Sequence, residues 1–526
     1  MIDISNMSLK VGAVDILRDV SLRIAEGEIF GLVGESGSGK SMTALSLMGL
    51  QPRSFTVTGQ ARLDGADLLT KSEAQMQHLR GNDIAMIFQE PMTALNPVQT
   101  IGDQVAETLL IHRAAGRHEA REIARDRLDR VGLPMIGLDR YPHELSGGQR
   151  QRVCIAAAIA LHPRLLIADE PTTALDVTTQ AQILDLLKGL VAEEEMSLLL
   201  ITHDLAVVSD MADRIAVMQA GQIVEQGATA QVLRDQAHPY TRALFEASSH
   251  QPARAAEPRE DAILRLSDVH RHYPGPRQGF TRGDPVRAVD GVSFDLVRGE
   301  SLGLVGESGC GKSTLTRAIL GLDPITSGQI TLNGHAVHPA MPRARRADVQ
   351  VVFQDPYGSF NPRWRVDRIV TEPFYLLDTP PARGPAVADA LRAVRLSPDD
   401  AQKYPHEFSG GQRQRIAIAR ALITRPKLLV LDEAVSALDV SVRAQILDLL
   451  AELQAEFGLS YLFISHDLTV VRAITDRVLV MQKGQIVEQG ATEDIFTAPR
   501  HPYTQQLLAA APMLPNDLGE RHDTVV

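Results

Sequence analysis

The chain has 526 residues, which is enough for roughly three to four domains of about 150 residues each. Its hydrophobic fraction of 44% suits packed cores. It contains no run of about 18 uninterrupted apolar residues, so we expect no membrane-spanning helix. The net charge of −12 favours solubility and argues against a nucleic-acid-binding surface, although a local basic patch is compatible with it.

The N-terminal sequence and the two cysteines indicate the cellular compartment in which the chain folds. The opening sequence MIDISNMSLK has neither the basic nor the apolar region of an export signal, so we expect none. Cys154 and Cys310 lie in different halves and offer neither a disulfide framework nor metal-ligand spacing. Both observations suit a reducing cytoplasm.

The same series of elements is predicted twice along the chain. Each half opens with alternating segments typical of a small antiparallel sheet, followed by an apolar strand, a glycine-rich loop, a helix and a stretch of helical periodicity. The sheet, strand and helical stretch fall at Ile2 to Ile24, Ile29 to Val33 and Ile101 to Val131, and again at Ile263 to Leu296, Leu302 to Val305 and Val366 to Val394. Further strands and helices follow. This order predicts an α/β fold with a mostly parallel sheet covered by helices on both faces, an antiparallel β subdomain and a helical subdomain.

Landmarks of the second half follow those of the first at a constant spacing of 263 residues. The pairs are Ser146 and Ser409, Asp169 and Asp432, His203 and His466, and His238 and His501. A gene duplication and fusion explains this repetition more simply than chance does. We therefore expect two domains, at 1–250 and 262–526, joined by a solvated linker at 251–261 that is rich in alanine, proline and charge.

Each half carries a glycine-rich loop of the pattern G-x-x-x-x-G-K-[ST]. Glycines let the backbone N–H groups converge on nucleotide phosphates, the lysine reaches the β and γ oxygens, and the serine hydroxyl suits Mg²⁺. The residues predicted to bind ATP are Gly34, Glu35, Ser36, Gly37, Ser38, Gly39, Lys40 and Ser41 in the first loop, and Gly306, Glu307, Ser308, Gly309, Cys310, Gly311, Lys312, Ser313 and the following Thr314 in the second. We expect Ser41 and Ser313 to be ligands of Mg²⁺.

Two apolar strands, with the sequences LLIADE and LLVLDE, end in adjacent carboxylates. The first acid of each pair, Asp169 or Asp432, is predicted to hold the Mg²⁺ shell. The second, Glu170 or Glu433, is predicted to orient or deprotonate the attacking water. A positioned base typically contributes about 10² to 10⁴ in rate.

An S-G-G-Q element precedes each acidic strand at a predicted helix start and forms a second anion-binding nest. Its residues are Ser146, Gly147, Gly148 and Gln149 in the first half and Ser409, Gly410, Gly411 and Gln412 in the second. In this position the element resembles the signature of ATP-binding cassette (ABC) ATPases. The resemblance implies two tandem P-loop ABC nucleotide-binding domains, in which the signature of one half completes the site of the other around two head-to-tail ATP molecules.

Further motifs match the same family in the same order. They are its Q-loop glutamine, which senses Mg²⁺ and the membrane partner, its switch histidine, which contacts the γ-phosphate, and its D-loop aspartate. The matching residues are Gln89 and Gln354, His203 and His466, and Asp176 and Asp439, respectively. Neither half has lost its acids or its histidine, so the resemblance implies two hydrolytically competent sites, with the glutamines near the metal and the histidines in catalysis.

The family also stacks an aromatic ring on adenine ahead of the glycine loop. Tyr273 fits this role in the second half, whereas its counterpart in the first half is Val11. Since stacking contributes on the order of 1 kcal/mol, we expect the first site to hold ATP more weakly. Cys310 is interpreted as a tolerated small residue rather than a redox switch.

Sequences beyond the core motifs narrow the subgroup. In both halves QIVEQGAT is followed by HPYT, and these segments, with EPMTALNP and DPYGSFNP after the Q-loop glutamines, resemble the oligopeptide, dipeptide and nickel importer ATPases. The fused arrangement is similar to the ATPases of glutathione and microcin-type peptide importers. We interpret the HPYT residues individually as a packed turn without ligand contact. The cysteine cluster of some unfused members is absent, so we expect no iron–sulfur cluster.

The resemblance implies the ATP-hydrolysing subunit of a bacterial importer for peptides, peripheral to the cytoplasmic face of the inner membrane. The implied partners are two transmembrane permease subunits and an extracytoplasmic substrate-binding protein, and no nucleic acid. Tyr357, Phe360 and Trp364 are predicted either to face the permeases or to pack locally.

Two alternatives remain at this point. The chain could be a fused sugar-importer ATPase, which two intact sites and paired HPYT segments disfavour. It could also be a soluble tandem protein acting on ribosomes or nucleic acid, which the short linker and acidic charge disfavour. The cargo is selected by the partners and is left open by the sequence.

Overall fold

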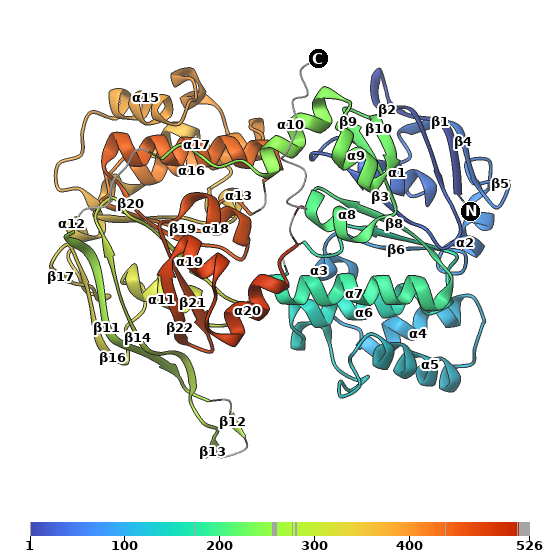
Figure 1. The fold of residues 1–526 in the computed structure, drawn as a ribbon, viewed down its shortest axis with the longest axis horizontal. Helices are drawn as coiled ribbons and strands as arrows, with labels where there is room; N and C mark the ends of the chain where they lie inside the picture. The colour runs from blue at the N-terminus through green and yellow to red at the C-terminus, as the bar shows by residue number, and fades with distance from the viewer. Residues whose placement is uncertain are drawn as a thin grey trace. The chain divides into compact units, whose positions relative to one another are not determined.

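The computed structural model describes residues 2–173, 175–254, 260–275, 277–278, 281–436, 438–512 and 514. The chain divides into two compact units, Met1–Ser248 and Ser249–Ala511 (Figure 1). Each unit contains a six-stranded sheet and a four-stranded antiparallel sheet with the same strand order. The expected tandem α/β architecture is therefore confirmed.

In the first unit the four-stranded sheet has the order β2-β1-β4-β5 and the six-stranded sheet has the order β10-β9-β3-β8-β7-β6. All pairs of the larger sheet are parallel except β10 with β9. The strands are β1 (Ile2–Val11), β2 (Val14–Ile24), β3 (Ile29–Val33), β4 (Phe55–Leu63), β5 (Ala66–Asp67), β6 (Ile84–Ile87), β7 (Leu165–Asp169), β8 (Ser197–Thr202), β9 (Arg214–Gln219) and β10 (Gln222–Ala228). The helices are α1 (Lys40–Leu47), α2 (Glu73–Leu79), α3 (Pro91–Ala94), α4 (Ile101–Ile111), α5 (Arg117–Arg130), η1 (Pro142–Glu144), α6 (Gly147–Ala158), α7 (Val177–Glu194), α8 (Leu205–Met211), α9 (Thr229–Asp235) and α10 (Pro239–Ser248).

The second unit repeats this plan, with sheets ordered β14-β11-β16-β17 and β18-β19-β20-β15-β21-β22 and a short additional pair, β12 and β13. Its strands are β11 (Ala262–Tyr273), β12 (Arg277–Gln278), β13 (Thr281–Arg282), β14 (Val286–Val297), β15 (Ser301–Val305), β16 (Ser327–Leu332), β17 (His335–Ala336), β18 (Val349–Val352), β19 (Leu428–Asp432), β20 (Ser460–Ile464), β21 (Arg477–Gln482) and β22 (Gln485–Ala491). Its helices are α11 (Lys312–Ile319), α12 (Arg343–Arg346), α13 (Pro356–Ser359), α14 (Val366–Val370), η2 (Glu372–Leu376), α15 (Arg383–Ala393), η3 (Pro398–Gln402), η4 (Pro405–Glu407), α16 (Gly410–Leu422), α17 (Val440–Phe457), α18 (Leu468–Ile474), α19 (Thr492–Thr497) and α20 (Pro502–Ala509).

The helix that follows each glycine loop joins the two sheets of its unit. In the first unit a single apolar core contains Leu9 and Leu17 of the antiparallel sheet, Leu47 of α1, and Phe30 and Leu165 of the larger sheet. The strands β3, β7 and β8 are buried along their whole length, which is typical of parallel strands covered on both faces. The core therefore fixes the start of α1 relative to the ends of these strands.

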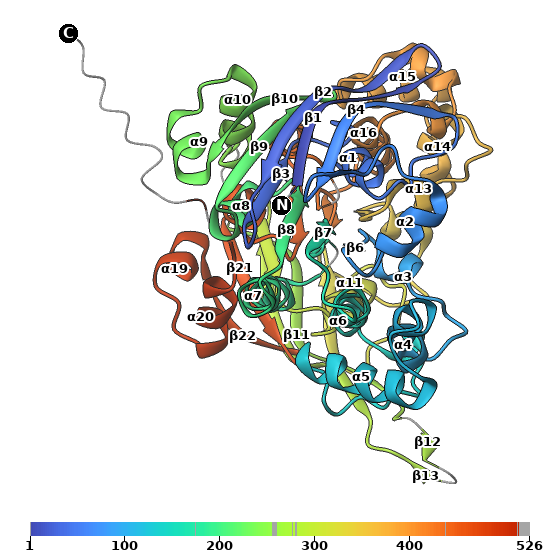
Figure 2. The same ribbon diagram turned by 90° about the vertical axis from the view of Figure 1, so that its right-hand side faces the viewer.

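The stretches with helical periodicity form a separate helical layer. In the first unit α4 and α5 pack on each other and on α6, which also contacts α7 (Figure 2). In the second unit α14, α15 and α16 pack together, with the 3₁₀ segment η2 beside α14 and α16. Each signature helix, α6 or α16, thus belongs to the helical layer and packs on the neighbouring strand, β6 or β18.

The segment between the two domains was expected to be a solvated linker at 251–261, of which residues 255–259 lie outside the described part of the chain. The residues just before them pack on the second unit. Pro252 is buried, His250 Nε2 lies 2.7 Å from Asp448 Oδ1, and the Arg254 guanidinium lies 2.7 Å from Asp476 Oδ2. These contacts hold residues 250 to 254 on the second unit.

Candidate nucleotide-binding sites

Each glycine-rich loop connects a buried strand to a helix that begins at the loop lysine. The preceding glycines, Gly39 and Gly311, have left-handed φ angles of 105° and 115°. A Cβ atom on Gly311 would lie 2.1 Å from the carbonyl oxygen of Ala288. Both the backbone angle and the close approach therefore require glycine at this position.

The lysine side chains fold back into their loops and are buried. Lys40 Nζ donates to the carbonyl oxygens of Gly34 and Glu35 at 2.7 and 2.9 Å. Lys312 Nζ makes the same contacts in the second loop at 2.6 and 2.9 Å. Each loop thus encloses an ammonium group beside a helix N-terminus, an arrangement that attracts phosphate.

The remaining predicted loop residues lie in the same turn or at the start of the helix. They are Ser36, Gly37, Ser38 and Ser41 in the first half, and Ser308, Gly309, Cys310, Ser313 and Thr314 in the second. Ser38 and Cys310 occupy equivalent buried positions. Burial raises the pKa of the Cys310 thiol, which lowers its thiolate fraction and its reactivity. This favours the interpretation of Cys310 as a small packing residue.

In the first unit the two acids at the end of β7 face different partners. Asp169 Oδ1 accepts a hydrogen bond from Ser41 Oγ at 3.2 Å, which places two oxygen ligands side by side. Burial, together with the charge of Glu170, raises the pKa of Asp169. A divalent cation bound there would stabilise the buried carboxylate, and the oxygen donors fit Mg²⁺.

Glu170 follows the strand with a left-handed φ of 48° and is surrounded by donors. Its carboxylate accepts hydrogen bonds from Gln89 Nε2 at 2.9 Å and Thr173 Oγ1 at 2.9 Å, and lies 3.1 Å from His203 Nδ1. Burial alone would raise the pKa of Glu170, but His203, Thr173 and Lys40 outweigh it and lower the pKa to about 2. In this state Glu170 is ionised at neutral pH and is a weak base, which suits orientation of water better than deprotonation.

The second unit builds the corresponding cluster with fewer contacts to its glutamate. His466 Nδ1 lies 3.1 Å from Glu433 Oε1, and Glu433 has a left-handed φ of 51°. Gln354 Nε2, however, donates to Ser436 Oγ at 3.5 Å, and that hydroxyl donates to the backbone carbonyl of Glu433 at 3.0 Å. Burial would raise the pKa of Glu433, but the hydrogen bond and charge of His466 outweigh it and lower the pKa.

A cavity of about 500 Å³ opens between the acids and the Q-loop of the second unit. It is lined by Ser313, Gln354, Asp432 and Glu433 together with Phe353, Asp355, Gly358 and Ser359. The predicted metal ligands of this half therefore share one cavity. Burial, with the charge of Glu433, raises the pKa of Asp432 as it does in the first unit.

Each signature element forms the N-terminus of a helix whose first N–H groups are capped by side chains. Ser146 and Ser409 each cap their helix in a reciprocal capping box with the glutamine three residues later, Gln149 or Gln412. A Cβ atom on the second glycine would lie 2.4 Å from a side-chain carbon of Thr179 or Val442 of the following helix. That glycine is needed for packing, while the first, Gly147 or Gly410, leaves the backbone of the nest open. The pairing of each signature with the glycine loop of the other half stays a prediction.

The adenine-stacking candidate lies at the end of β11. Tyr273 pairs with Val286 there, as Val11 pairs with Val14 at the end of β1. The strand registers therefore place Tyr273 and Val11 at equivalent positions. The Arg271 guanidinium lies 4.6 Å from the centre of the Tyr273 ring.

Sequence reasoning missed a direct contact between the HPYT segments and the glycine loops. The Tyr240 hydroxyl accepts a hydrogen bond from the Glu35 N–H at 3.3 Å, and the Tyr503 hydroxyl accepts one from the Glu307 N–H at 3.0 Å. The contact bridges 205 residues in the first unit, so no local pattern reveals it. The only sequence signal was the repetition of HPYT at the same spacing as the catalytic motifs.

The histidine and proline of HPYT help to present this tyrosine. The histidine side chain accepts a hydrogen bond from the tyrosine N–H, at 3.2 Å in both halves, and the proline starts the helix. The histidine N–H in turn donates to Glu225 or Glu488 at 3.0 Å. The threonine, Thr241 or Thr504, is buried. The segment is a capped helix start that aims a hydroxyl at the loop.

Comparison with known proteins places the chain in a family. Residues 17–173 and 289–436 match the family described as ABC transporter. Residues 224–268 and 487–524 match the family described as oligopeptide/dipeptide transporter, C-terminal region. The chain therefore belongs to the ABC transporter family, and it is a nucleotide-binding ATPase with two cassettes of that family.

The similar proteins include the glutathione import ATP-binding protein GsiA of Escherichia coli (strain K12) and of Shigella sonnei (strain Ss046). Each is 47% identical over 96% of this chain and 87% of its own length. Among solved structures, a dimeric post-hydrolysis state of the ATP-binding cassette MJ0796 with ADP and Pi is 31% identical over 44% of this chain and 99% of that chain, with a TM-score of 0.40. No helix of the described residues has the length and apolar character needed to cross a membrane.

Proposed function

We propose that this chain is the ATP-hydrolysing subunit of a bacterial importer for peptides, with glutathione-like peptides as the first cargo to test. The observation that carries the proposal is that two intact nucleotide clusters occur in one chain together with two oligopeptide-type C-terminal regions. The relatives named for glutathione import support the cargo class.

The proposed chemistry assigns separate tasks to the residues of each cluster. Lys40 and the loop N–H groups bind the β- and γ-phosphates, while Ser41 and Asp169 would hold Mg²⁺, with Gln89 nearby. Bound there, Mg²⁺ would neutralise charge on the phosphates. Glu170 orients the attacking water. The second cluster uses Lys312, Ser313, Asp432, Gln354 and Glu433 in the same way.

The switch histidines make the base strength of each glutamate depend on bound ATP. His203 and His466 lie against the catalytic glutamates and help to keep their pKa low. If His203 moves from Glu170 to the γ-phosphate, Glu170 loses the contact that lowers its pKa most and becomes a stronger base. Base strength would then rise only when a triphosphate is present.

Closure of the two halves on ATP would be transmitted to two permease subunits at the cytoplasmic face of the inner membrane. The aromatic residues of the second Q-loop region differ in exposure. Phe360 is buried beneath Arg420, whose guanidinium lies 5.0 Å from the ring centre, while Tyr357 is 44% exposed. Tyr357 is therefore the better candidate for permease contact, and Phe360 is a packing residue.

Co-expression with permeases tests the function. The chain should sediment with bacterial membranes only when its two permeases are present, and its ATPase activity should respond to the peptide-loaded binding protein. Sedimentation with ribosomes regardless of permeases would contradict the proposal. Tyr357→Ala should reduce co-purification with the permeases. Tyr375→Ala, at a more exposed tyrosine elsewhere in the helical layer, serves as the control.

A further inference from the structure

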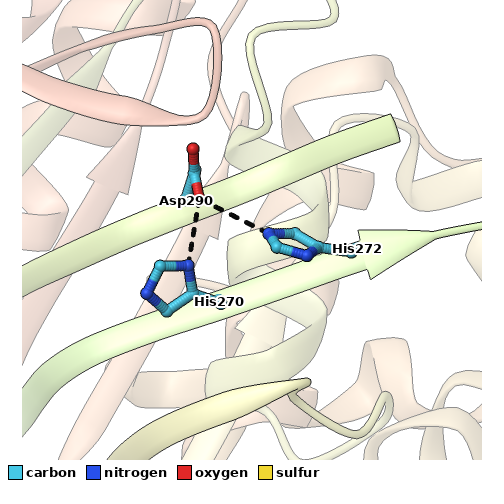
Figure 3. Close-up of side chains that lie close together, drawn as sticks. All are labelled: His270, His272 and Asp290. Carbon is cyan, nitrogen blue, oxygen red and sulfur yellow. Dashed lines mark hydrogen bonds and ion pairs between the residues drawn. The ribbon is translucent and has the colours of Figure 1, made fainter. Parts of the chain in front are cut away.

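Three side chains that the nucleotide clusters do not use converge on the antiparallel sheet of the second unit. His270 and His272 are two residues apart on β11, so they share one face of the strand, and Asp290 comes from the neighbouring strand β14 (Figure 3). One potential ligand atom from each residue lies within 4.8 Å of the other two. All three side chains are partly accessible, with exposed fractions of 24%, 27% and 17%.

The spacing of these atoms fits one bound metal ion. Asp290 Oδ1 lies 3.0 Å from His270 Nδ1 and 3.4 Å from His272 Nε2. A tetrahedral Zn²⁺ with bonds of about 2.0–2.1 Å holds its ligand atoms about 3.3 Å apart. An ion could therefore bind all three groups with small side-chain movements. Nε2 of His272 is buried and contacts Asp290 Oδ1 at 3.4 Å without the geometry of a hydrogen bond, so this nitrogen is available to a metal ion.

The surroundings resemble a supported metal site more than an isolated ion pair. His270 Nε2 lies 3.1 Å from Asp268 Oδ1, so a carboxylate holds the ring from the side opposite Asp290. Metal-bound histidines usually have such a partner, because it fixes the tautomer and strengthens the ligand. Arg287 lies 3.4 Å from Asp290 Oδ2 and leaves Oδ1 facing the histidines. A cavity of about 560 Å³ reaches His270 and Asp290 beside β22 and gives access to the cluster.

The first unit shows the same scaffold without the ligands. The strand registers match Ser8 to His270 and Lys10 to His272, and Arg18, between the paired residues Leu17 and Val20, to Asp290, between Val289 and Val292. Two of these are cationic and would repel a metal ion. The cluster is therefore specific to the second unit. The residues of the first unit show which substitutions this sheet tolerates at the same positions.

We propose that His270 Nδ1, His272 Nε2 and Asp290 Oδ1 bind one divalent transition-metal ion of the Zn²⁺ type, with Asp268 supporting His270 and water completing the coordination. The ion would link β11 to β14 immediately before Tyr273. Because it binds the folded chain, it stabilises the second unit by a free energy that grows with the logarithm of its concentration divided by Kd.

The test uses the full chain without nucleotide, in excess Mg²⁺, with Co²⁺ as a spectroscopic probe and Zn²⁺ as its competitor. The wild type should bind one Co²⁺ with visible bands of a four-coordinate nitrogen and oxygen site, Zn²⁺ should bleach them, and Zn²⁺ should raise the melting temperature. The double variant His270→Ser, His272→Lys, which copies the first unit, should lose all three responses.

His335→Ser, which removes an exposed histidine from β17 of the same sheet, is the matched control and should keep the site. If the double variant melts lower than the wild type without metal, the single variant His270→Gln replaces it. Either no saturable Co²⁺ binding by the wild type, or equal binding by the wild type and the folded variants, would overturn the proposal.

Discussion

The first unit surrounds the glutamate that follows its acidic strand with more donors than the second unit does. Glu170 accepts hydrogen bonds from both Gln89 and Thr173, whereas Gln354 in the second unit turns to Ser436. The serine hydroxyl contacts a backbone carbonyl instead of the carboxylate. The equivalent residues differ by one methyl group, since Thr173 stands where the second unit has Ser436. Two copies of nearly the same motif therefore carry different hydrogen-bond networks around the same glutamate.

Replacement of both glutamates should have the largest effect. Glu170→Gln with Glu433→Gln removes the carboxylate that orients water while preserving shape, so we expect turnover to fall by about 10² to 10⁴. ATP binding should be unchanged. Steady-state hydrolysis and equilibrium nucleotide binding measure the two effects, and the single variants show how much each half contributes. Undiminished turnover of the double variant would contradict the assignment.

The tyrosine contacts should affect ATP binding more than the chemical step. Tyr503→Phe removes the hydroxyl that accepts the Glu307 N–H, and one such hydrogen bond contributes about 0.5–1.5 kcal/mol. We expect KM for ATP to rise about two- to tenfold with little change in kcat. Tyr240→Phe, whose contact is longer at 3.3 Å, should have a smaller effect. A fall in kcat without a change in KM would place the tyrosines outside phosphate binding.

Exchange of the residues at the position predicted to stack on adenine tests whether the halves differ in affinity. Val11→Tyr should tighten ATP binding by the first unit, and Tyr273→Val should weaken it in the second, each by about fivefold for a stacking contact of about 1 kcal/mol. Titration with a fluorescent ATP analogue, using variants in which the other loop lysine is replaced, isolates each site. Each substitution is compared with the unchanged residue in the same lysine variant, which gives four proteins. Equal affinities in all four would show that Tyr273 does not bind adenine.

The histidine and glutamate pair in the second unit predicts a modest dependence of stability on pH. Burial alone would lower the pKa of His466, but Glu433 outweighs it and raises the pKa. The stabilisation is therefore complete below the unfolded pKa of about 6.5 and is lost as pH rises through the higher folded value. His466→Gln should lower the melting temperature by about 2–4 °C at about pH 6 and by less at alkaline pH. A pH-independent difference would show that the histidine is not ionised in the pair.

Much of the fold follows from patterns that are local in sequence. The strand Ile29–Val33 was predicted at its observed bounds because an apolar run next to a glycine loop leaves few alternatives. The helical stretches were also predicted, but the first divides into α4 and α5 and the second into α14, η2 and α15. In the second stretch the break is wider. Pro373 and Pro380, together with the turn between them, interrupt that helix, because proline lacks the N–H that a helix interior requires.

The site was less predictable where contacts join distant segments. The loops, acids and histidines were found from their motifs, and the structure brings Gln89, Glu170 and His203 together. The reach of Tyr240 to the glycine loop depends on how α10 packs on β10, which no short motif encodes. The His270 and Asp290 contact likewise depends on the register between β11 and β14, which includes bulges.

The hydroxyl that joins each HPYT helix to its glycine loop brings the last helix of a cassette against the loop near its start. In each half the C-terminal helix is therefore tied by a hydrogen bond to the loop that is predicted to bind the triphosphate. Both halves of the fused chain retain this hydrogen bond. An inserted tag or a cleavage just before either HPYT histidine would weaken nucleotide binding, although the site of the change lies about 200 residues from the glycine loop in sequence.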